Sequence, residues 1–155
     1  MDSELRQQLI EKYKAGPDVL AEALAGASEA ELDHRPGPQD WTAREVVHHT
    51  ADSEMTSAIR LRKLLAEDGA QIQGYDEQEF ARRLHYDRPI EGSLAAVRGA
   101  RAASAALLER LTPEEWGREG THSESGRYTV EGWLEIYAAH CHDHAEQIRR
   151  ARGAS

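Results

Sequence analysis

The sequence has few of the features on which secreted and membrane proteins depend. It contains one cysteine, Cys141, so no disulfide can form within the chain and nothing in it calls for an oxidising compartment. The first residues lack a basic start followed by an apolar run, and no stretch approaches the ~20 apolar residues that span a bilayer. We therefore expect a soluble, cytoplasmic protein without a membrane partner.

Positive charge is scarce as well. Lysine and arginine together number 19 against 28 aspartate and glutamate residues, which gives a formal net charge of −9 at pH 7. A protein that binds nucleic acid needs a positive surface to neutralise the phosphate backbone. The charge balance therefore argues against a nucleic-acid partner, and we expect a small-molecule substrate instead.

Residues that favour strands are also few. There is a single phenylalanine and β-branched residues are sparse, whereas Ala, Leu, Glu and Arg dominate, so we predict helices and no convincing strand. With 155 residues, of which 39% are hydrophobic, the chain is long enough for one domain with a core and short for two. We assign residues 1–152 to this domain and expect residues 153–155 to be a disordered C-terminal end.

Apolar spacing and capping residues predict four long helices. Thr42 and Glu45 form a capping box at the start of the second helix, whereas Gly16-Pro17 should break or kink the first. The predicted long helices cover residues 3–25, 42–67, 90–111 and 129–151, with a short helix over 77–84 and loops over 69–75 and 116–128. Four long helices with short accessory helices predict an all-α four-helix bundle.

Histidine is the residue type that stands out: there are eight, and five lie in two short runs. His140 and His144 are four residues apart, so on a helix they share one face and both can reach one metal ion. Tyr137 and Trp133 extend that face, which predicts that the pair points into the bundle. His142 lies about 200° around the helix from His140 and should face outward. Because exposed pairs with this spacing are usually just solvated, the pair alone does not establish a metal site.

The second run, His48-His49, lies near the start of the second long helix. A bundle brings side chains from facing helices to one point in its core, so one of these residues can join the pair. Helical phase does not decide between them. Glu45 and Asp52 lie within one turn of His49 and could orient its second ring nitrogen, which favours His49 slightly and makes Asp52 a candidate supporting acid. Three neutral imidazoles leave a fourth position open for water or substrate, as in catalytic metal sites.

Two segments resemble the signatures of a known family. Residues 41–54, WTAREVVHHTADSE, resemble the Trp-Ser-x-x-Glu-x-x-x-His-x-x-Asp-x-Glu segment of the DinB/YfiT-like family. Residues 137–148, YAAHCHDHAEQI, resemble its His-x-x-x-His segment followed by x-x-Gln-Ile. The similarity extends in order and spacing over nearly the whole chain. It implies a four-helix bundle that holds a divalent metal, commonly zinc or nickel, with three histidines, and that often forms dimers.

Carried over to this sequence, the resemblance implies that the metal ligands are His49, His140 and His144 and that the protein forms a homodimer. Many relatives have His-Asp-Arg-His-His where residues 140–144 are HCHDH, so the outer ligand positions are kept and the three between them differ. We expect Cys141 to pack between helices as a small residue. The remaining histidines are predicted to be surface or loop residues: His34, His48, His85, His122 and His142.

Such a site is compatible with three functions. A metal with an open position lowers the pKa of water toward neutrality, which favours a metal-dependent hydrolase. The open position could instead bind a thiolate, and because relatives of the family include enzymes that use low-molecular-weight thiols, the resemblance also supports a thiol S-transferase or isomerase. A third interpretation is a non-catalytic metal-binding stress-response protein, in which the ion stabilises the bundle. Of the three we favour the hydrolase.

Overall fold

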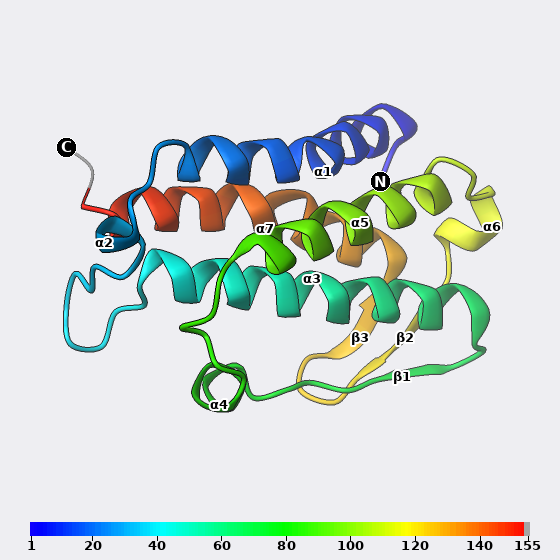
Figure 1. Cartoon of the computed structure of the whole chain (residues 1–155). Coiled ribbons are helices and arrows are strands. Elements are labelled where there is room, and N and C mark those ends of the chain that lie inside the picture. Colours follow the sequence, from blue (N-terminus) through cyan, green and yellow to red (C-terminus); the bar gives the residue numbers. More distant parts are fainter. Residues whose placement is uncertain (154–155) are drawn as a thin grey trace.

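The computed structural model describes residues 1–153, so residues 154–155 of the predicted disordered end lie outside the described residues. Residues 1–153 contain four long helices, which lie side by side (Figure 1) and confirm the predicted four-helix bundle. They are α1 (Ser3–Leu24), α3 (Ala43–Ala66), α5 (Glu91–Leu108) and α7 (Val130–Ala151). The accessory helices are α2 (Glu29–Leu32), α4 (Glu77–Arg83) and α6 (Pro113–Trp116). Within residues 1–153 there is no helix whose length and apolar character would let it cross a membrane.

The two helices that carry the conspicuous histidines begin where their sequence dictates. The side-chain oxygen of Thr42 accepts a hydrogen bond from the backbone N–H of Glu45 at the start of α3. Thr129 accepts one from the N–H of Gly132 at the start of α7. These caps fix the first turn of each helix, and therefore which residues face each other where α3 and α7 pack together.

The prediction that the chain has no strand is wrong. A small sheet, drawn beside α3 in Figure 1, consists of β1 (Ala70–Ile72), β2 (Glu119–His122) and β3 (Gly126–Thr129), in that order. β1 pairs parallel to β2, and β2 pairs antiparallel to β3. The strands are short and polar, and one pair joins segments about 50 residues apart, so no local pattern marks them. The close approach at Gly120, where a Cβ would lie 2.3 Å from the Ala70 carbonyl oxygen, is a tertiary requirement.

The break predicted at Gly16-Pro17 does not occur, because α1 runs through both residues without interruption. Pro17 has no N–H to donate to the carbonyl of Tyr13, four residues earlier. Nη1 of Arg101, on α5, donates to that carbonyl instead at 2.5 Å. Gly16 leaves room for it, since a Cβ there would lie 2.5 Å from the same Nη1. The dipeptide therefore makes a place for an arginine from another helix.

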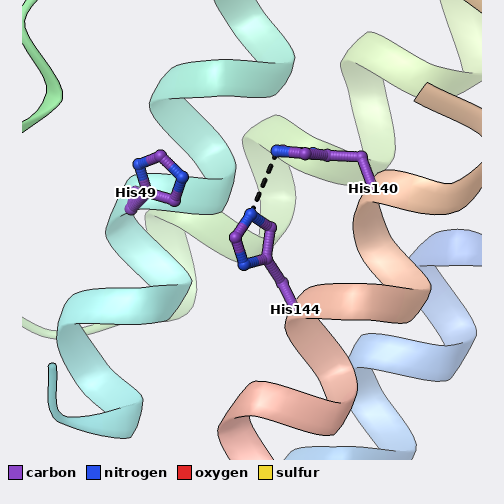
Figure 2. A group of neighbouring side chains, drawn as sticks. All are labelled: His49, His140 and His144. Atoms are coloured by element: carbon purple, nitrogen blue, oxygen red, sulfur yellow. Dashed lines mark hydrogen bonds between the residues drawn. The ribbon is translucent and has the colours of Figure 1, made fainter. Parts of the chain in front are cut away.

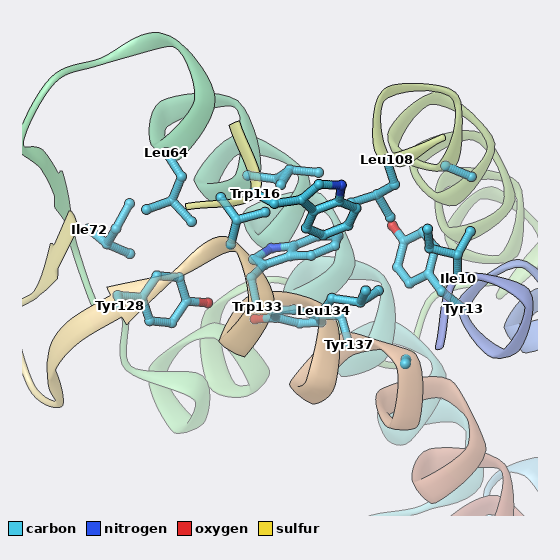
Figure 3. Packing of buried hydrophobic residues seen from close by; sticks show 14 of the residues in the cluster. Ile10, Tyr13, Leu64, Ile72, Leu108, Trp116, Tyr128, Trp133, Leu134 and Tyr137 are labelled. Atoms are coloured by element: carbon cyan, nitrogen blue, oxygen red, sulfur yellow. The ribbon is translucent and has the colours of Figure 1, made fainter. Parts of the chain in front are cut away.

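A polar layer divides the apolar core in two. Figure 3 shows one cluster around Trp133, where the first half of α7 meets α1 and the sheet. The other joins the second half of α7 to the start of α3 and includes Val46 and Ile148. Along the helices, Glu54 and Arg101 lie between the two clusters and are buried. The histidines of α3 and α7 lie next to this layer.

Candidate metal centre

Three histidine side chains converge between α3 and α7. His49 comes from the beginning of α3, whereas His140 and His144 come from consecutive turns of α7, and one ring nitrogen of each lies within 4.8 Å of the others. Figure 2 shows the three rings around a common space between the two helices. The ring centroid of His144 lies 4.5 Å from that of His140 and 4.9 Å from that of His49. The structure thus brings together the three residues selected from the sequence.

The hydrogen bonds of His140 and His144 indicate what kind of ligand the space between the three rings accepts. Nδ1 of His140 lies 2.8 Å from Oε1 of Glu54, and Nδ1 of His144 lies 2.8 Å from Oε1 of Gln147. Both oxygens accept hydrogen bonds, so each Nδ1 carries the proton of its ring. When the rings are neutral, their Nε2 atoms present lone pairs to each other across the 3.1 Å contact drawn in Figure 2. Two acceptors at this distance need a cation to bind both.

Two of the three rings do not bind a proton at neutral pH. Burial and the adjacent His140 lower the pKa of His144 to about 4, and burial with the two neighbouring imidazoles lowers the pKa of His49 to about 3. Both rings are therefore neutral near pH 7, which is the form that binds metal ions. A set of three imidazole nitrogens fits a divalent ion.

A buried ion pair holds His140 in this orientation. Arg101 donates from Nε and Nη2 to the two carboxylate oxygens of Glu54, at 3.1 and 2.6 Å, and both side chains are at most 1% exposed. Burial favours the neutral form of Glu54, but the hydrogen bond from His140 and the charge of Arg101 outweigh it, so the pKa of Glu54 is lowered. Glu54 is therefore ionised where it accepts the Nδ1 proton of His140, as carboxylates behind metal-binding histidines commonly do.

Sequence reasoning missed Arg101, although a signal for it exists. Four residues to either side of it on α5 lie Val97 and Ala105, and both are buried. Helical periodicity therefore puts Arg101 on the inward face. An arginine is almost never fully buried without a partner, so this position signals a carboxylate on a facing helix. The sequence did not say which carboxylate that is.

The third histidine is held differently. Trp41 packs edge-on against His49 with the ring centroids 4.9 Å apart, and Nδ1 of His49 is buried without a hydrogen-bond partner among residues 1–153. Asp52, which we expected to orient this ring, accepts a hydrogen bond from the hydroxyl of Tyr86 at 2.6 Å. The supporting role of Asp52 at the site stays a prediction.

Two histidines expected on the surface or in loops are buried, which corrects those assignments. His48 is fully buried on the side of α3 that faces α5, where its ring nitrogens lie 2.7 Å from Ser93 Oγ and 2.8 Å from the Arg88 carbonyl oxygen. His122 is buried at the end of β2. α3 packs against both α5 and α7, so its buried arc is wide enough to include two consecutive histidines.

Cys141, His34 and His85 lie where the sequence predicts them. Cys141 is buried between helices, and burial beside Glu54 raises the pKa of its thiol, so it remains protonated. His34 and His85 are exposed. His142, expected to face outward, lies away from the three-histidine cluster but is half-buried against α1, where its Nε2 is 3.0 Å from the Lys12 carbonyl oxygen.

The fold and the cluster define a class of protein, a four-helix bundle with a candidate three-histidine metal centre between two of its helices. Comparison with protein families places the chain within that class. The model of the DinB superfamily matches residues 12–148, and the chain belongs to this superfamily.

Several relatives cover most of the chain. YfiT of Bacillus subtilis is 31% identical over 151 residues, which is 96% of this chain and 84% of YfiT. The solved structure of YfiT, described as "a probable metal-dependent hydrolase with an unusual four-helix bundle topology", matches with a TM-score of 0.91 and 30% identity over 97% of this chain and 87% of that one. A protein of Oceanobacillus iheyensis named a "putative metal-dependent hydrolase" is 34% identical over 132 residues, or 85% of this chain and 77% of that protein.

Proposed function

We propose that this protein is a metal-dependent hydrolase whose divalent ion, zinc or nickel, is held by His49, His140 and His144. The observation that carries the proposal is the convergence of one ring nitrogen from each of the three histidines, with the Nε2 atoms of His140 and His144 only 3.1 Å apart. When bound by neutral ligands, such an ion keeps its full charge and supplies Lewis acidity, which lowers the pKa of water and polarises a carbonyl group. The names of the relatives described above support the same class.

The residues around the ligands prepare them for this task. Glu54 and Gln147 hold the rings of His140 and His144 with Nε2 toward the site, so these ligands are oriented in advance. Trp41 packs edge-on against His49, which is 5% exposed. Asp52 lies one turn along α3 from His49 and is the candidate supporting acid.

Metal analysis of the purified protein tests the ligand set. We expect about one divalent ion per chain in the wild type and none in a His140→Ala, His144→Ala double variant. His142→Ala is the matched control, because this histidine lies on the same helix but away from the cluster, and it should leave the metal content unchanged. Equal metal content in the wild type and the double variant would contradict the assignment of His140 and His144 as metal ligands.

Assays with and without the metal test the reaction. We expect hydrolysis of a panel of esters and amides that is abolished by EDTA and restored by zinc or nickel. Metal-dependent consumption of a low-molecular-weight thiol with an electrophile, in the absence of hydrolysis, would replace this proposal by a thiol S-transferase. No turnover in either assay, together with a large metal-dependent rise in the thermal midpoint, would indicate a non-catalytic metal-binding protein.

A further inference from the structure

A cavity of about 310 Å³ lies beside the three histidines, between the segment 36–41 and the end of α7. Two of its lining residues contact the candidate ligands directly. Trp41 packs against His49, and Gln147 accepts the Nδ1 proton of His144. The cavity is therefore separated from two of the three histidines by a single side chain in each case.

Gln147 has a free hydrogen-bonding group at this cavity. Its carbonyl oxygen accepts a hydrogen bond from His144. Its NH₂ group has no hydrogen-bond partner among residues 1–153 and is not one of the buried polar groups that lack a partner. A molecule in the cavity that accepts a hydrogen bond from this amide would contact a residue that also orients His144. Gln147 thus links the cavity to the metal centre.

Two opposite charges line the same cavity without neutralising each other. Asp40 and Arg150 are both exposed, and neither forms an ion pair with any residue in the described part of the chain. By contrast, Arg149 beside Arg150 pairs with Glu146. A cation and an anion that share a cavity, but lie too far apart to pair, are complementary to a ligand that carries both charges.

We propose that this cavity binds the amino and carboxylate groups of an amino-acid-like molecule. Arg150 and the amide of Gln147 bind the carboxylate, and Asp40 binds the ammonium group. Trp41, which lines the cavity and packs against His49, supplies the apolar surface for the ligand's side chain on the side of the three histidines. This proposal rests on the proposed hydrolase function, because it makes amino acids with an ester or amide in the side chain the substrate class.

Binding of three related probes to the full-length, zinc-loaded protein tests the proposal. Phenylalanine carries both charges, 3-phenylpropionate only the carboxylate and 2-phenylethylamine only the ammonium group. Chemical shifts of the Trp41 indole N–H and the Gln147 side-chain amide report occupancy of the cavity. We expect phenylalanine to bind about tenfold more tightly than either singly charged probe, because it forms both charged contacts.

Substitutions separate the two charges. Arg150→Gln should reduce the affinity for phenylalanine to that for 2-phenylethylamine, and Asp40→Asn should reduce it to that for 3-phenylpropionate. Arg149→Gln, the neighbouring charge that lies outside the cavity lining, should change neither. Equal affinity for the three probes, no binding of any of them, or wild-type binding by Arg150→Gln would overturn the proposal.

The same titrations on the zinc-free protein keep this test apart from that of the proposed function. Charge-selective binding in a protein that neither retains zinc nor hydrolyses esters would support the amino-acid site and contradict the hydrolase function. Retained zinc and hydrolysis without charge-selective binding would support the hydrolase function and contradict the amino-acid site.

Discussion

Arg101 donates a hydrogen bond from Nη1 to the backbone carbonyl of Tyr13 at 2.5 Å, and this contact joins α5 to α1 at the point where Pro17 leaves the carbonyl free. The same guanidinium pairs with Glu54, which in turn accepts the Nδ1 proton of His140. A position on α1 that looks like a helix breaker is therefore connected through two buried charges to the candidate metal centre.

This connection makes Gly16 sensitive to substitution. Gly16→Ala places a Cβ 2.5 Å from Nη1 of Arg101 and 2.9 Å from Cβ of Cys141, so we expect a loss of about 1–3 kcal/mol in the free energy of unfolding. Gly99→Ala on α5 is the control, because a Cβ there meets nothing within 4 Å and should be stabilising by about 0.5–1 kcal/mol through helix propensity. Urea unfolding of the two variants measures both values, and equal stabilities would contradict the packing argument.

Removing the charge of Glu54 should affect both stability and metal binding. Glu54→Gln leaves Arg101 buried without its counter-charge, so we expect a loss of about 3–5 kcal/mol in the free energy of unfolding. Because His140 also loses its carboxylate, zinc affinity should fall about 10–100-fold, measured by competition with a chelator under folding conditions. Glu45→Gln, on the same helix, removes a more exposed pair with Arg35 and should cost no more than about 1 kcal/mol without changing zinc affinity.

The low pKa values of two histidines predict how the metal-free chain responds to acid. His49 and His144 have pKa values of about 3 and about 4 in the folded protein, against 6.5 for an ordinary histidine. Between the folded and unfolded pKa values, the unfolded chain binds more protons than the folded chain. The contribution of these histidines to the free energy of unfolding is therefore greatest above pH 6.5 and decreases as the pH falls toward 4.

Urea midpoints of the metal-free protein between pH 7 and pH 5 measure this decrease over a range in which ordinary carboxylates remain ionised. A His49→Leu, His144→Leu double variant lacks both groups and should show a shallower slope. The same slope in both proteins would mean that these two histidines do not titrate as their burial requires.

Tyr86 offers a way to examine Asp52. Tyr86→Phe removes the hydroxyl that donates to Asp52 at 2.6 Å and leaves a buried carboxylate without this partner, so we expect a loss of about 1–3 kcal/mol in the free energy of unfolding. Zinc content should be retained, because neither residue belongs to the three-histidine cluster. If Asp52 supports the reaction, Asp52→Asn reduces hydrolysis more than Tyr86→Phe does at equal zinc content. Equal activity in Asp52→Asn and the wild type would restrict Asp52 to a structural role.

The sequence by itself determined the long helices and the shared face of two of the three candidate ligands. Thr42 and Thr129 carry the capping hydrogen bonds that begin α3 and α7, and such bonds depend only on neighbours three residues away. The spacing of His140 and His144 likewise fixes their shared helical face. Local rules of this kind can be read from a single chain.

Only the tertiary structure decided the rest. Helical phase left His48 and His49 open and the family resemblance implied His49, but the physical reason is tertiary: His48 contacts Ser93 of α5, whereas His49 faces the histidines of α7. The same holds for the strand pairing in the small sheet, for the continuity of α1 through Gly16-Pro17 and for the partner of Arg101. Each depends on which segments meet in space. Each of these contacts joins residues more than 30 positions apart, where the spacing along the chain carries no geometric information.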